Sequence, residues 1–239
     1  TDINFFMKIS VIITTYNEIL TIAEIIEQVR NIDLGDDFEK EIIVVDNISN
    51  DGTRELLRKL EKEKDIQVIY QTKNLGKSYS FRTAIPLCSG DYVISQDADL
   101  EYNPQDIIKI LNHLILYDYD VVIGSRINTG ERYHAYKINE YGIGFLNKIT
   151  NLLFRTEYTD VATCYKLMKL NKLKELNLYS TGFNLDFELC AKYAKYKWKV
   201  GEVKIEYNCR TFEEGRKTRN PIWHGLRALY TILRERITN

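Results

Sequence analysis

The first half of the chain alternates short apolar runs with segments of helical periodicity. Residues 8–14, KISVIIT, are a β-branched run typical of a buried parallel strand, and the apolar positions of residues 19–30 recur at helical spacing. Four more strands are predicted at residues 41–46, 66–70, 91–95 and 120–123. Helices are predicted from residue 53 to about 62, after residue 77 to about 88, and after Pro104. This alternation predicts an α/β fold with a mainly parallel, Rossmann-like central sheet flanked by helices.

The second half has a less regular pattern. Residues 141–154, 183–196 and 221 to about 236 have helical spacing, and residues 200–207 alternate as a strand does. No Pro- or Gly-rich linker and no internal repeat separates the halves. We therefore expect a single domain over residues 1–239, divided functionally at about residue 126.

Polar clusters follow the predicted strands at their carboxyl ends. The sequences TTYNE, DNISNDG, QDAD and GSR come directly after the first, second, fourth and fifth strands. In open α/β sheets, ligands bind beyond the carboxyl ends of the strands. The coincidence predicts a binding site at that edge of the sheet.

The Asp97-Ala98-Asp99 turn is the first candidate for chemistry at this edge. Two aspartates that flank one small residue can project toward the same ion, and Glu101 is a further candidate ligand. Mg²⁺ and Mn²⁺ prefer such carboxylate oxygens, and a divalent cation neutralises the charge that develops on a departing diphosphate. A DxD string also occurs by chance as solvated turn acids, but its position after a buried strand favours the metal site.

Composition narrows the functional classes. Hydrophobic residues make up 44% and charged residues 28%, as in ordinary globular proteins. The net charge of −1 excludes a generic polyanion binder, so we expect no nucleic-acid partner. From Phe187 onward, however, twelve Lys and Arg face six acids, which suggests that one face meets an anionic surface. A solvated basic helix is the alternative.

Other features bear on compartment and on rival enzyme classes. No apolar run is long enough to cross a bilayer, and four dispersed cysteines are typical of reduced thiols in the cytoplasm. A P-loop is excluded because Gln71 stands where its first glycine is required. The turn after the first strand lacks the GxGxxG of a dinucleotide-binding fold, and the three histidines form no catalytic arrangement.

An ordered series of segments resembles the family-2 glycosyltransferases of GT-A fold. The series is VIITTYNE at residues 11–18, VVDNISNDGT at 44–53, NLGK at 74–77, DADL at 97–100 and GSR at 124–126. In the second half, TDVATCYK at residues 159–166, FNLDFE at 183–188 and RTFEEGRK at 210–217 are similar to segments of the dolichol- and polyprenyl-phosphate glycosyltransferases. The likeness covers residues 8 to about 236. It implies a nucleotide-sugar-binding half at about residues 8–126 and an acceptor-binding half at about 127–239.

The resemblance also implies roles for individual residues. Those expected to bind the nucleotide are Thr14, Tyr16, Glu18, Asp46, Asn47, Lys77 and Asp97. Asp97, Asp99 and Glu101 would hold Mg²⁺ or Mn²⁺, and Asp160, Lys166, Glu188 and Arg210 would bind the acceptor. The residues expected to act in catalysis are Asp97, Asp99, Arg126, Arg210 and Lys217. Arginine suits these positions because its planar guanidinium binds phosphate oxygens in pairs.

Departures from the family pattern bear on the donor. Thr14 replaces the usual proline, Asn47 replaces the usual second aspartate, and Ile48 replaces a glycine. A carboxylate matches the paired donors of guanine, whereas an amide matches the adjacent N–H and C=O of uracil. The sequence therefore favours a UDP-sugar over a GDP-sugar.

Two acceptors are compatible with the sequence. A lipid phosphate is already anionic at neutral pH, with a second pKa of about 6, so it needs cations and no base. A glycan hydroxyl needs a general base, for which Asp186 and Glu188 are candidates. The basic residues 210–219 favour inverting transfer to a polyprenyl or dolichyl phosphate. A protein that binds a nucleotide-sugar without catalysis is a third possibility.

The last predicted helix supports the lipid acceptor. Residues 221–236 place a tryptophan, leucines and a tyrosine on one helical face, with arginines nearby, as in helices that lie in a membrane interface. A helix packed back on the sheet is the alternative. The interpretation predicts peripheral contact with the cytoplasmic face of a membrane, directly or through a membrane-anchoring partner.

Overall fold

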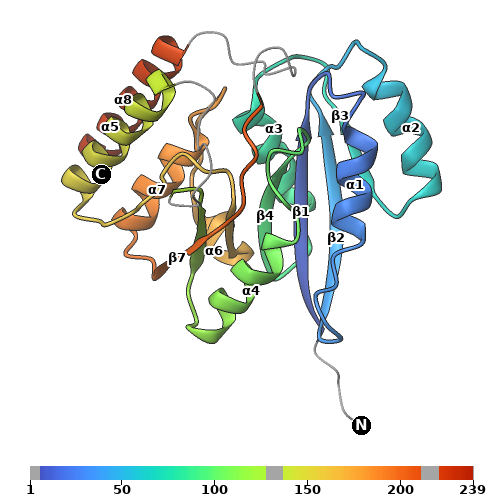
Figure 1. Cartoon of the computed structure of the whole chain (residues 1–239), viewed down its shortest axis with the longest axis horizontal. Helices are drawn as coiled ribbons and strands as arrows, with labels where there is room; N and C mark the ends of the chain where they lie inside the picture. Colours follow the sequence, from blue (N-terminus) through green and yellow to red (C-terminus); the bar gives the residue numbers. More distant parts are fainter. Residues whose placement is uncertain (1–5, 128–136, 211–220, 239) are drawn as a thin grey trace.

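The computed structural model describes residues 6–127, 137–210 and 221–238. Seven strands of these segments form one sheet in the order β3-β2-β1-β4-β6-β5-β7 (Figure 1). The strands are β1 (Met7–Thr15), β2 (Phe38–Asp46), β3 (Gln67–Tyr70), β4 (Tyr92–Asp97), β5 (Val121–Ser125), β6 (Lys166–Lys169) and β7 (Val200–Lys204). Neighbouring strands are parallel except at β6, which is antiparallel to β4 and β5. The prediction of a mainly parallel α/β sheet is confirmed.

Helices cover both faces of the sheet. They are α1 (Ile22–Arg30), α2 (Thr53–Glu63), α3 (Lys77–Ala84), α4 (Asp106–Leu116), α5 (Lys137–Phe154), α6 (Leu170–Glu175), α7 (Leu185–Lys195) and α8 (Pro221–Ile237), with a 3₁₀ turn η1 (Ile85–Leu87). One core contains residues of α1, α2 and α4, and the other contains residues of α3, α5, α6, α7 and α8. Figure 1 shows α5 and α8 side by side at the end of the molecule away from α2. No helix in the described segments is long and apolar enough to cross a bilayer.

The apolar runs of the first two strands explain why the sheet is buried on both sides. Successive side chains of a strand point to opposite faces. In β1, Val11 and Ile13 enter the core beneath α1, whereas Ile12 enters the core beneath α3. Burying each such side chain stabilises the fold by about 1.5–3 kcal/mol. The unbroken β-branched run is therefore what a central strand of a two-sided sheet requires.

Two elements of the second half differ from the prediction. β6 was not predicted, because its sequence KLMK is short and carries two lysines, one of them fully buried beside β5 and β4. The strand predicted at residues 200–207 ends at Lys204, and Tyr207 instead forms an isolated bridge with Tyr102. This bridge places the segment after β7 beside the turn that follows β4.

The strand register brings the polar carboxyl ends together. Thr14 of β1 lies opposite Val45 of β2 on one side and Asp97 of β4 on the other, and Thr15 lies opposite Asp46. The turns that begin at these residues therefore share one edge of the sheet. The candidate site is built at this edge.

Candidate active site

The acidic turn begins at the last residue of β4. Asp97 ends the strand, and the chain turns at Leu100, which has a left-handed φ of 62°. The Thr21 hydroxyl donates to the Ala98 carbonyl at 2.6 Å, which fixes the turn to the start of α1. The Glu101 amide donates to Asp99 Oδ1 at 3.2 Å. The turn is thus held from both sides, and its carboxylates project from a rigid base.

Two cationic side chains contact these carboxylates. Lys77 Nζ, at the start of α3, lies 2.5 Å from Asp97 Oδ1. Arg210 Nη2 lies 3.2 Å from Asp99 Oδ2 and 3.3 Å from Glu18 Oε1. Burial alone would lower the pKa of Lys77, but the surrounding negative groups, Asp97 foremost, together outweigh it and raise that pKa. The structure therefore brings together five residues predicted from sequence: Glu18, Lys77, Asp97, Asp99 and Arg210.

The charge on Asp99 is incompletely compensated. Burial, together with repulsion from Asp97 and Glu101, raises the pKa of Asp99 to about 7, although Arg210 opposes the shift. The described part of the chain contains no group of three or more His, Cys, Asp or Glu side chains placed to hold a metal ion. Mg²⁺ is usually held by one or two carboxylates together with phosphate oxygens and waters. Asp97 and Asp99 fit an ion that is shared with a ligand's phosphates.

Glu101 has a different set of contacts from those expected of a third metal ligand. Its Oε2 accepts the Tyr207 hydroxyl, and its Oε1 accepts the Arg210 amide at 3.0 Å. Its main-chain carbonyl accepts the Asn208 amide at 2.8 Å. In this structure Glu101 fastens the segment after β7 to the acidic turn, and its role as a metal ligand stays a prediction.

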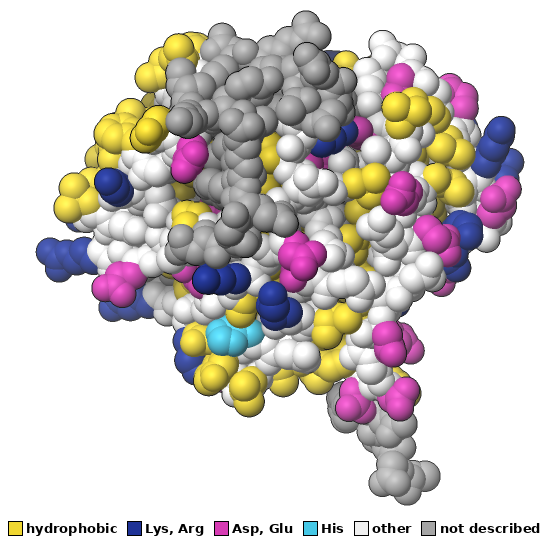
Figure 2. Space-filling view, in the orientation of Figure 1, with side chains coloured by type: hydrophobic (Ala, Val, Ile, Leu, Met, Phe, Trp, Pro, Cys, Tyr) yellow, Lys and Arg dark blue, Asp and Glu magenta, His cyan; other side chains and the backbone are white. Residues whose placement is uncertain are grey.

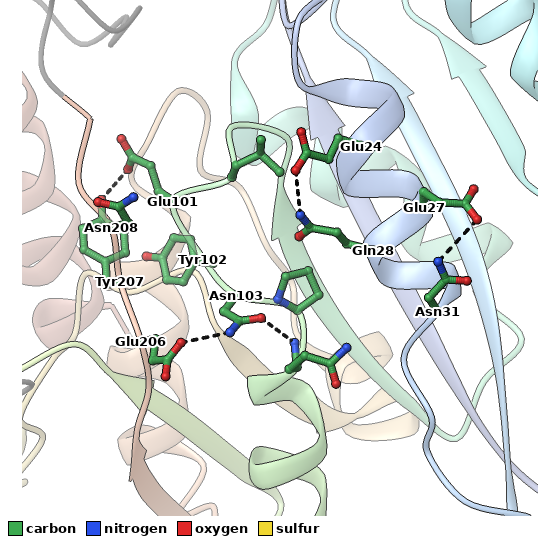
Figure 3. Close-up of a pocket in the computed structure, with 13 residues that line it drawn as sticks. Glu24, Glu27, Gln28, Asn31, Glu101, Tyr102, Asn103, Glu206, Tyr207 and Asn208 are labelled. Carbon is green, nitrogen blue, oxygen red and sulfur yellow. Dashed lines mark hydrogen bonds between the residues drawn. The ribbon is translucent and has the colours of Figure 1, made fainter.

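An open groove of about 980 Å³ runs beside the acidic turn (Figure 3). One wall is the polar face of α1, and the other is formed by residues 100–105 and 206–208. The labelled residues are Glu24, Glu27, Gln28, Asn31, Glu101, Tyr102, Asn103, Glu206, Tyr207 and Asn208. This groove could not be predicted from the sequence, because acids and amides on one helix face are also typical of ordinary solvated helices.

Asp46 is held inside the turn after β2. It is fully buried, its Oδ2 lies 2.9 Å from Arg54 Nε, and its Oδ1 accepts the Ser49 amide at 3.2 Å. In this structure the carboxylate shapes the turn, and the nucleotide-binding role of Asp46 stays a prediction. Arg54 was missed, because only the folded chain brings α2 over the end of β2.

Asn47 and Tyr16 lie next to this turn. The Asn47 amide donates to Asn74 Oδ1 at 2.9 Å and accepts from the Leu75 amide at 3.3 Å, which ties β2 to the loop before α3. Tyr16 is 37% exposed at the end of β1, whereas Thr14 is buried. Tyr16 is thus accessible to a nucleotide, and its role in nucleotide binding stays a prediction.

The second half contributes buried ion pairs. Arg126 donates through Nε and Nη2 to the two carboxylate oxygens of Asp160 at 2.7 and 2.9 Å, and the guanidinium lies 4.9 Å from the Tyr207 ring centre. Burial would raise the pKa of Asp160, but Arg126 outweighs it and lowers that pKa. Lys166 is also buried and pairs with Asp186 at 2.9 Å. In this structure these side chains are engaged in buried ion pairs, and the phosphate and acceptor contacts predicted for Arg126, Asp160 and Lys166 stay predictions.

Glu188 and Lys217 complete the predicted set. Glu188 is fully buried on α7, where it accepts the Ser180 amide at 2.9 Å and lies 3.7 Å from Lys192. In this structure the carboxylate is enclosed by these partners, and the acceptor-binding role of Glu188 stays a prediction. Lys217 lies outside the described residues.

Comparison with known proteins places this geometry among sugar-transferring enzymes. The sequence model described as Glycosyl transferase family 2 matches residues 10–176. Dolichol-phosphate mannosyltransferase of Pyrococcus furiosus is 31% identical, over 95% of this chain and 64% of that protein. Glycosyltransferase AglJ of Haloferax volcanii is 28% identical, over 83% of this chain and 62% of that protein. The chain thus spans less than two thirds of the length of both relatives.

Solved structures show the same fold at lower identity. Glucosyl-3-phosphoglycerate synthase of Mycobacterium tuberculosis, in complex with Mn²⁺, UDP and phosphoglyceric acid, matches with a TM-score of 0.72 at 16% identity. That match covers 98% of this chain and 80% of the other. TarS of S. aureus in complex with UDP matches with a TM-score of 0.63 at 19% identity, over 96% of this chain and 65% of the other.

Proposed function

The chain belongs to glycosyl transferase family 2, and we propose that it is an inverting, Mg²⁺- or Mn²⁺-dependent enzyme that transfers a sugar from a nucleotide-sugar to a polyprenyl or dolichyl phosphate. The observation that carries the proposal is the acidic turn at the carboxyl end of β4, held between Lys77 and Arg210. Carboxylates and cations around one point suit a substrate in which a diphosphate leaves a sugar.

The reaction follows from this arrangement. An acceptor phosphate oxygen forms a bond to the anomeric carbon while the bond from that carbon to the diphosphate oxygen breaks, and the nucleoside diphosphate leaves with the electron pair. Asp97 and Asp99 would hold a divalent cation, which would neutralise charge on that leaving group. Lys77 adds fixed positive charge beside it, where a preorganised cation needs no reorganisation during the reaction. Arg210 adds positive charge from the segment after β7.

The phosphate acceptor is favoured over a glycan hydroxyl. A hydroxyl acceptor requires a carboxylate base, but Glu188 is fully buried and Asp186 is paired with Lys166 at 2.9 Å. An anionic phosphate oxygen requires no base. The name of the Pyrococcus furiosus relative, a dolichol-phosphate mannosyltransferase, supports the same acceptor class.

The surface near α5 and α8 supports a lipid acceptor. Six large apolar side chains of α8 are 45–81% exposed: Ile222, Trp223, Leu226, Tyr230, Leu233 and Ile237. On neighbouring α5, Tyr141, Phe145 and Leu152 are 56–79% exposed. Figure 2 shows hydrophobic side chains along the edge where Figure 1 places these helices. We propose that this face, named the α5–α8 face, lies on the cytoplasmic surface of a membrane.

A UDP-sugar is the proposed donor. Asn47 in place of an aspartate supports it, as do the fold neighbours solved with UDP. In this structure the Asn47 amide already bonds to Asn74 and Leu75, so base recognition requires its remaining donor and acceptor capacity. Isothermal titration with UDP and GDP tests the preference, and clearly tighter GDP binding would reverse it.

Transfer is tested with a panel of UDP- and GDP-sugars and a short polyprenyl phosphate in the presence of Mn²⁺. We expect a sugar-labelled lipid product, and we expect Asp99→Ala to abolish it. Asp36→Ala is the matched control, because Asp36 is an exposed acid in the loop before β2. Labelling of a glycan instead of the lipid would favour the hydroxyl acceptor. Binding of nucleotide-sugar with neither transfer nor hydrolysis would identify a non-catalytic protein.

A further inference from the structure

Arg210 stands among the carboxylates of the acidic turn. Its Nη2 lies 3.2 Å from Asp99 and 3.3 Å from Glu18, and its Nε lies 3.6 Å from Glu101. The side chain of Arg210 is only 18% exposed. Three carboxylates thus contact one guanidinium, and in this structure the chain itself supplies the positive charge that balances them.

The same residue anchors the segment after β7. The Arg210 amide donates to Glu101 Oε1 at 3.0 Å, and two residues earlier the Asn208 amide donates to the Glu101 carbonyl at 2.8 Å. The Tyr207 hydroxyl reaches the other Glu101 oxygen. The position of residues 207–210 therefore depends on the same carboxylates that face the guanidinium.

A divalent cation and the Arg210 guanidinium compete for the negative charge of these carboxylates. Arg210 already contacts Oδ2 of Asp99, and two positive charges a few ångströms apart repel each other strongly at the low effective dielectric of a half-buried site. An ion at the acidic turn therefore weakens the contact between Arg210 and Asp99. By thermodynamic linkage, the contact of Arg210 with Asp99 weakens binding of the ion by the same factor by which the ion weakens that contact.

We infer that Arg210 is the resident counter-ion of the acidic turn, and that binding of a divalent cation displaces it and loosens the 207–210 segment. This inference rests on the proposed function, because that function brings a divalent cation to the turn. The inference goes beyond that function in one respect. Binding of the donor at the ends of β1 and β4 is coupled to the position of the acceptor-side segment 207–210.

The first test measures Mn²⁺ binding without nucleotide, by electron paramagnetic resonance of the unbound ion. Arg210→Met removes the competing charge and keeps most of the side-chain stem, so we expect its Kd for Mn²⁺ to fall about tenfold, within the usual range of coupling between sites. Arg210→Lys keeps a cation and should bind Mn²⁺ nearly as weakly as the wild type. Arg58→Met, on the exposed surface of α2, controls for the change in net charge. Equal Kd values for Arg210→Met and Arg58→Met would overturn the inference.

The second test uses the unaltered protein, so it does not depend on the folding of a variant. Hydrogen exchange at the Asn208 and Arg210 amides should accelerate when Mn²⁺ is added, because both amides are bonded to Glu101 beside the displaced guanidinium. The acceleration should be absent in Asp99→Asn. Unchanged or slower exchange in the wild type at saturating Mn²⁺ would refute the coupling.

Different experimental results would contradict the inference and the proposed function. Sugar transfer to lipid phosphate without a change in Mn²⁺ affinity in Arg210→Met would remove the counter-ion role and leave the enzyme activity intact. Tighter Mn²⁺ binding in that variant, without transfer from any donor in the panel, would remove the activity and leave the counter-ion role.

Discussion

Ile48 occupies a backbone conformation that disfavours its side chain. It lies in the turn after β2 with a φ of 61°, in the left-handed region. A residue with a Cβ pays about 1–2 kcal/mol there, and a β-branched side chain is an outlier. The related family pattern has glycine at this position, and the structure gives the physical reason. The turn is retained because the Ser49 amide and the Asn47 side chain are both held within the site.

Replacing Ile48 with glycine should therefore stabilise the protein. The gain is reduced by the larger conformational freedom that glycine loses on folding, about 0.5–1 kcal/mol, so we expect a net increase of about 0.5–1 kcal/mol in the free energy of unfolding. Urea denaturation measures it. Ile48→Ala is the matched control, since alanine keeps the Cβ and should give no such gain. An equal gain from both variants would show that the side chain beyond Cβ, and not the backbone, is responsible.

The Arg126–Asp160 pair gives a second prediction at this scale. Both side chains are buried, and Asp160 accepts two guanidinium hydrogen bonds. Asp160→Asn should lower the free energy of unfolding by about 3–5 kcal/mol, because it leaves a buried guanidinium without its counter-charge. Adding Arg126→Met should recover part of this loss.

An exposed ion pair provides the control for this experiment. Asp118 pairs with Lys169 at 2.7 Å, but its side chain is 85% exposed. Asp118→Asn should therefore cost less than about 1 kcal/mol. A loss for Asp160→Asn as small as that for Asp118→Asn would mean that the buried pair contributes no more to stability than the exposed one.

Individual site residues were predictable where local pattern fixes their position. Asp97 and Asp99 follow an apolar strand, so their place at the edge of the sheet followed from the order of elements. Asp46 occupies the equivalent place after β2, yet it turns inward to Arg54. Its direction depends on a partner from α2, and no spacing in the sequence encodes that contact. The same limit applies to the contact of Glu188 with the Ser180 amide, which lies in the loop before α7.

Among the elements, Glu41 of β2 ties together the amino-terminal ends of three strands. It accepts hydrogen bonds from the Ser10 hydroxyl of β1 and from the Ser89 and Gly90 amides before β4, and it lies 3.1 Å from Lys8. Burial alone would raise the pKa of Glu41, but these hydrogen bonds outweigh it and lower the pKa from 4.5 to about 2. The folded state therefore binds a proton at Glu41 less readily than the unfolded chain does.

The sign of the pH dependence follows from linkage. A carboxyl group with a depressed pKa stabilises the fold above its unfolded pKa, and that stability is lost as the pH falls from about 4.5 to about 2. Glu41→Gln should be less stable than the wild type at pH 7, and the difference should shrink over this acid range. Urea denaturation at several pH values measures it. Glu39→Gln, at an exposed position of the same strand, should show no such trend. A stability difference independent of pH would contradict the assignment to the Glu41 charge.

A strand or helix was predictable where the apolar pattern of its own residues determines how it is buried. β1, β2, β4 and β5 are apolar runs that bury on both faces, and α1 and α2 follow from helical spacing, so their bounds agree with the sequence pattern within about three residues. β6 is different, because its insertion between β4 and β5 depends on pairing partners more than forty residues away. The groove beside α1 likewise arises only when the segment after β7 crosses the turn after β4.

At the scale of the whole molecule, the α5–α8 face combines exposed apolar side chains with positive charge. Along α8 the exposed apolar positions recur every three or four residues, which is the spacing of one helix face. The single acid of α8, Glu235, is buried against Lys192 and Lys195, whereas Arg227 and Arg236 are exposed. Tryptophan, tyrosine and arginine around an apolar stripe suit the interface of an anionic bilayer. A protein partner would be expected to offer acids to pair with those arginines.

Binding to vesicles tests this interpretation. The wild type should sediment with phosphatidylcholine vesicles that contain phosphatidylserine, and weakly with phosphatidylcholine alone. Leu226 and Leu233 are 55% and 45% exposed, so substituting both by glutamate leaves the core intact. Each lost leucine removes about 1.5–3 kcal/mol when fully inserted, so binding should fall at least about tenfold.

Leu87→Glu with Leu116→Glu is the matched control, at positions 49% and 73% exposed in η1 and α4. Equal loss of vesicle binding in both double variants would assign the effect to net charge. Unchanged vesicle binding by the α8 variant would show that the α5–α8 face does not bind lipid. A dimer that dissociates only in the α8 variant would show that the face binds a second protein chain.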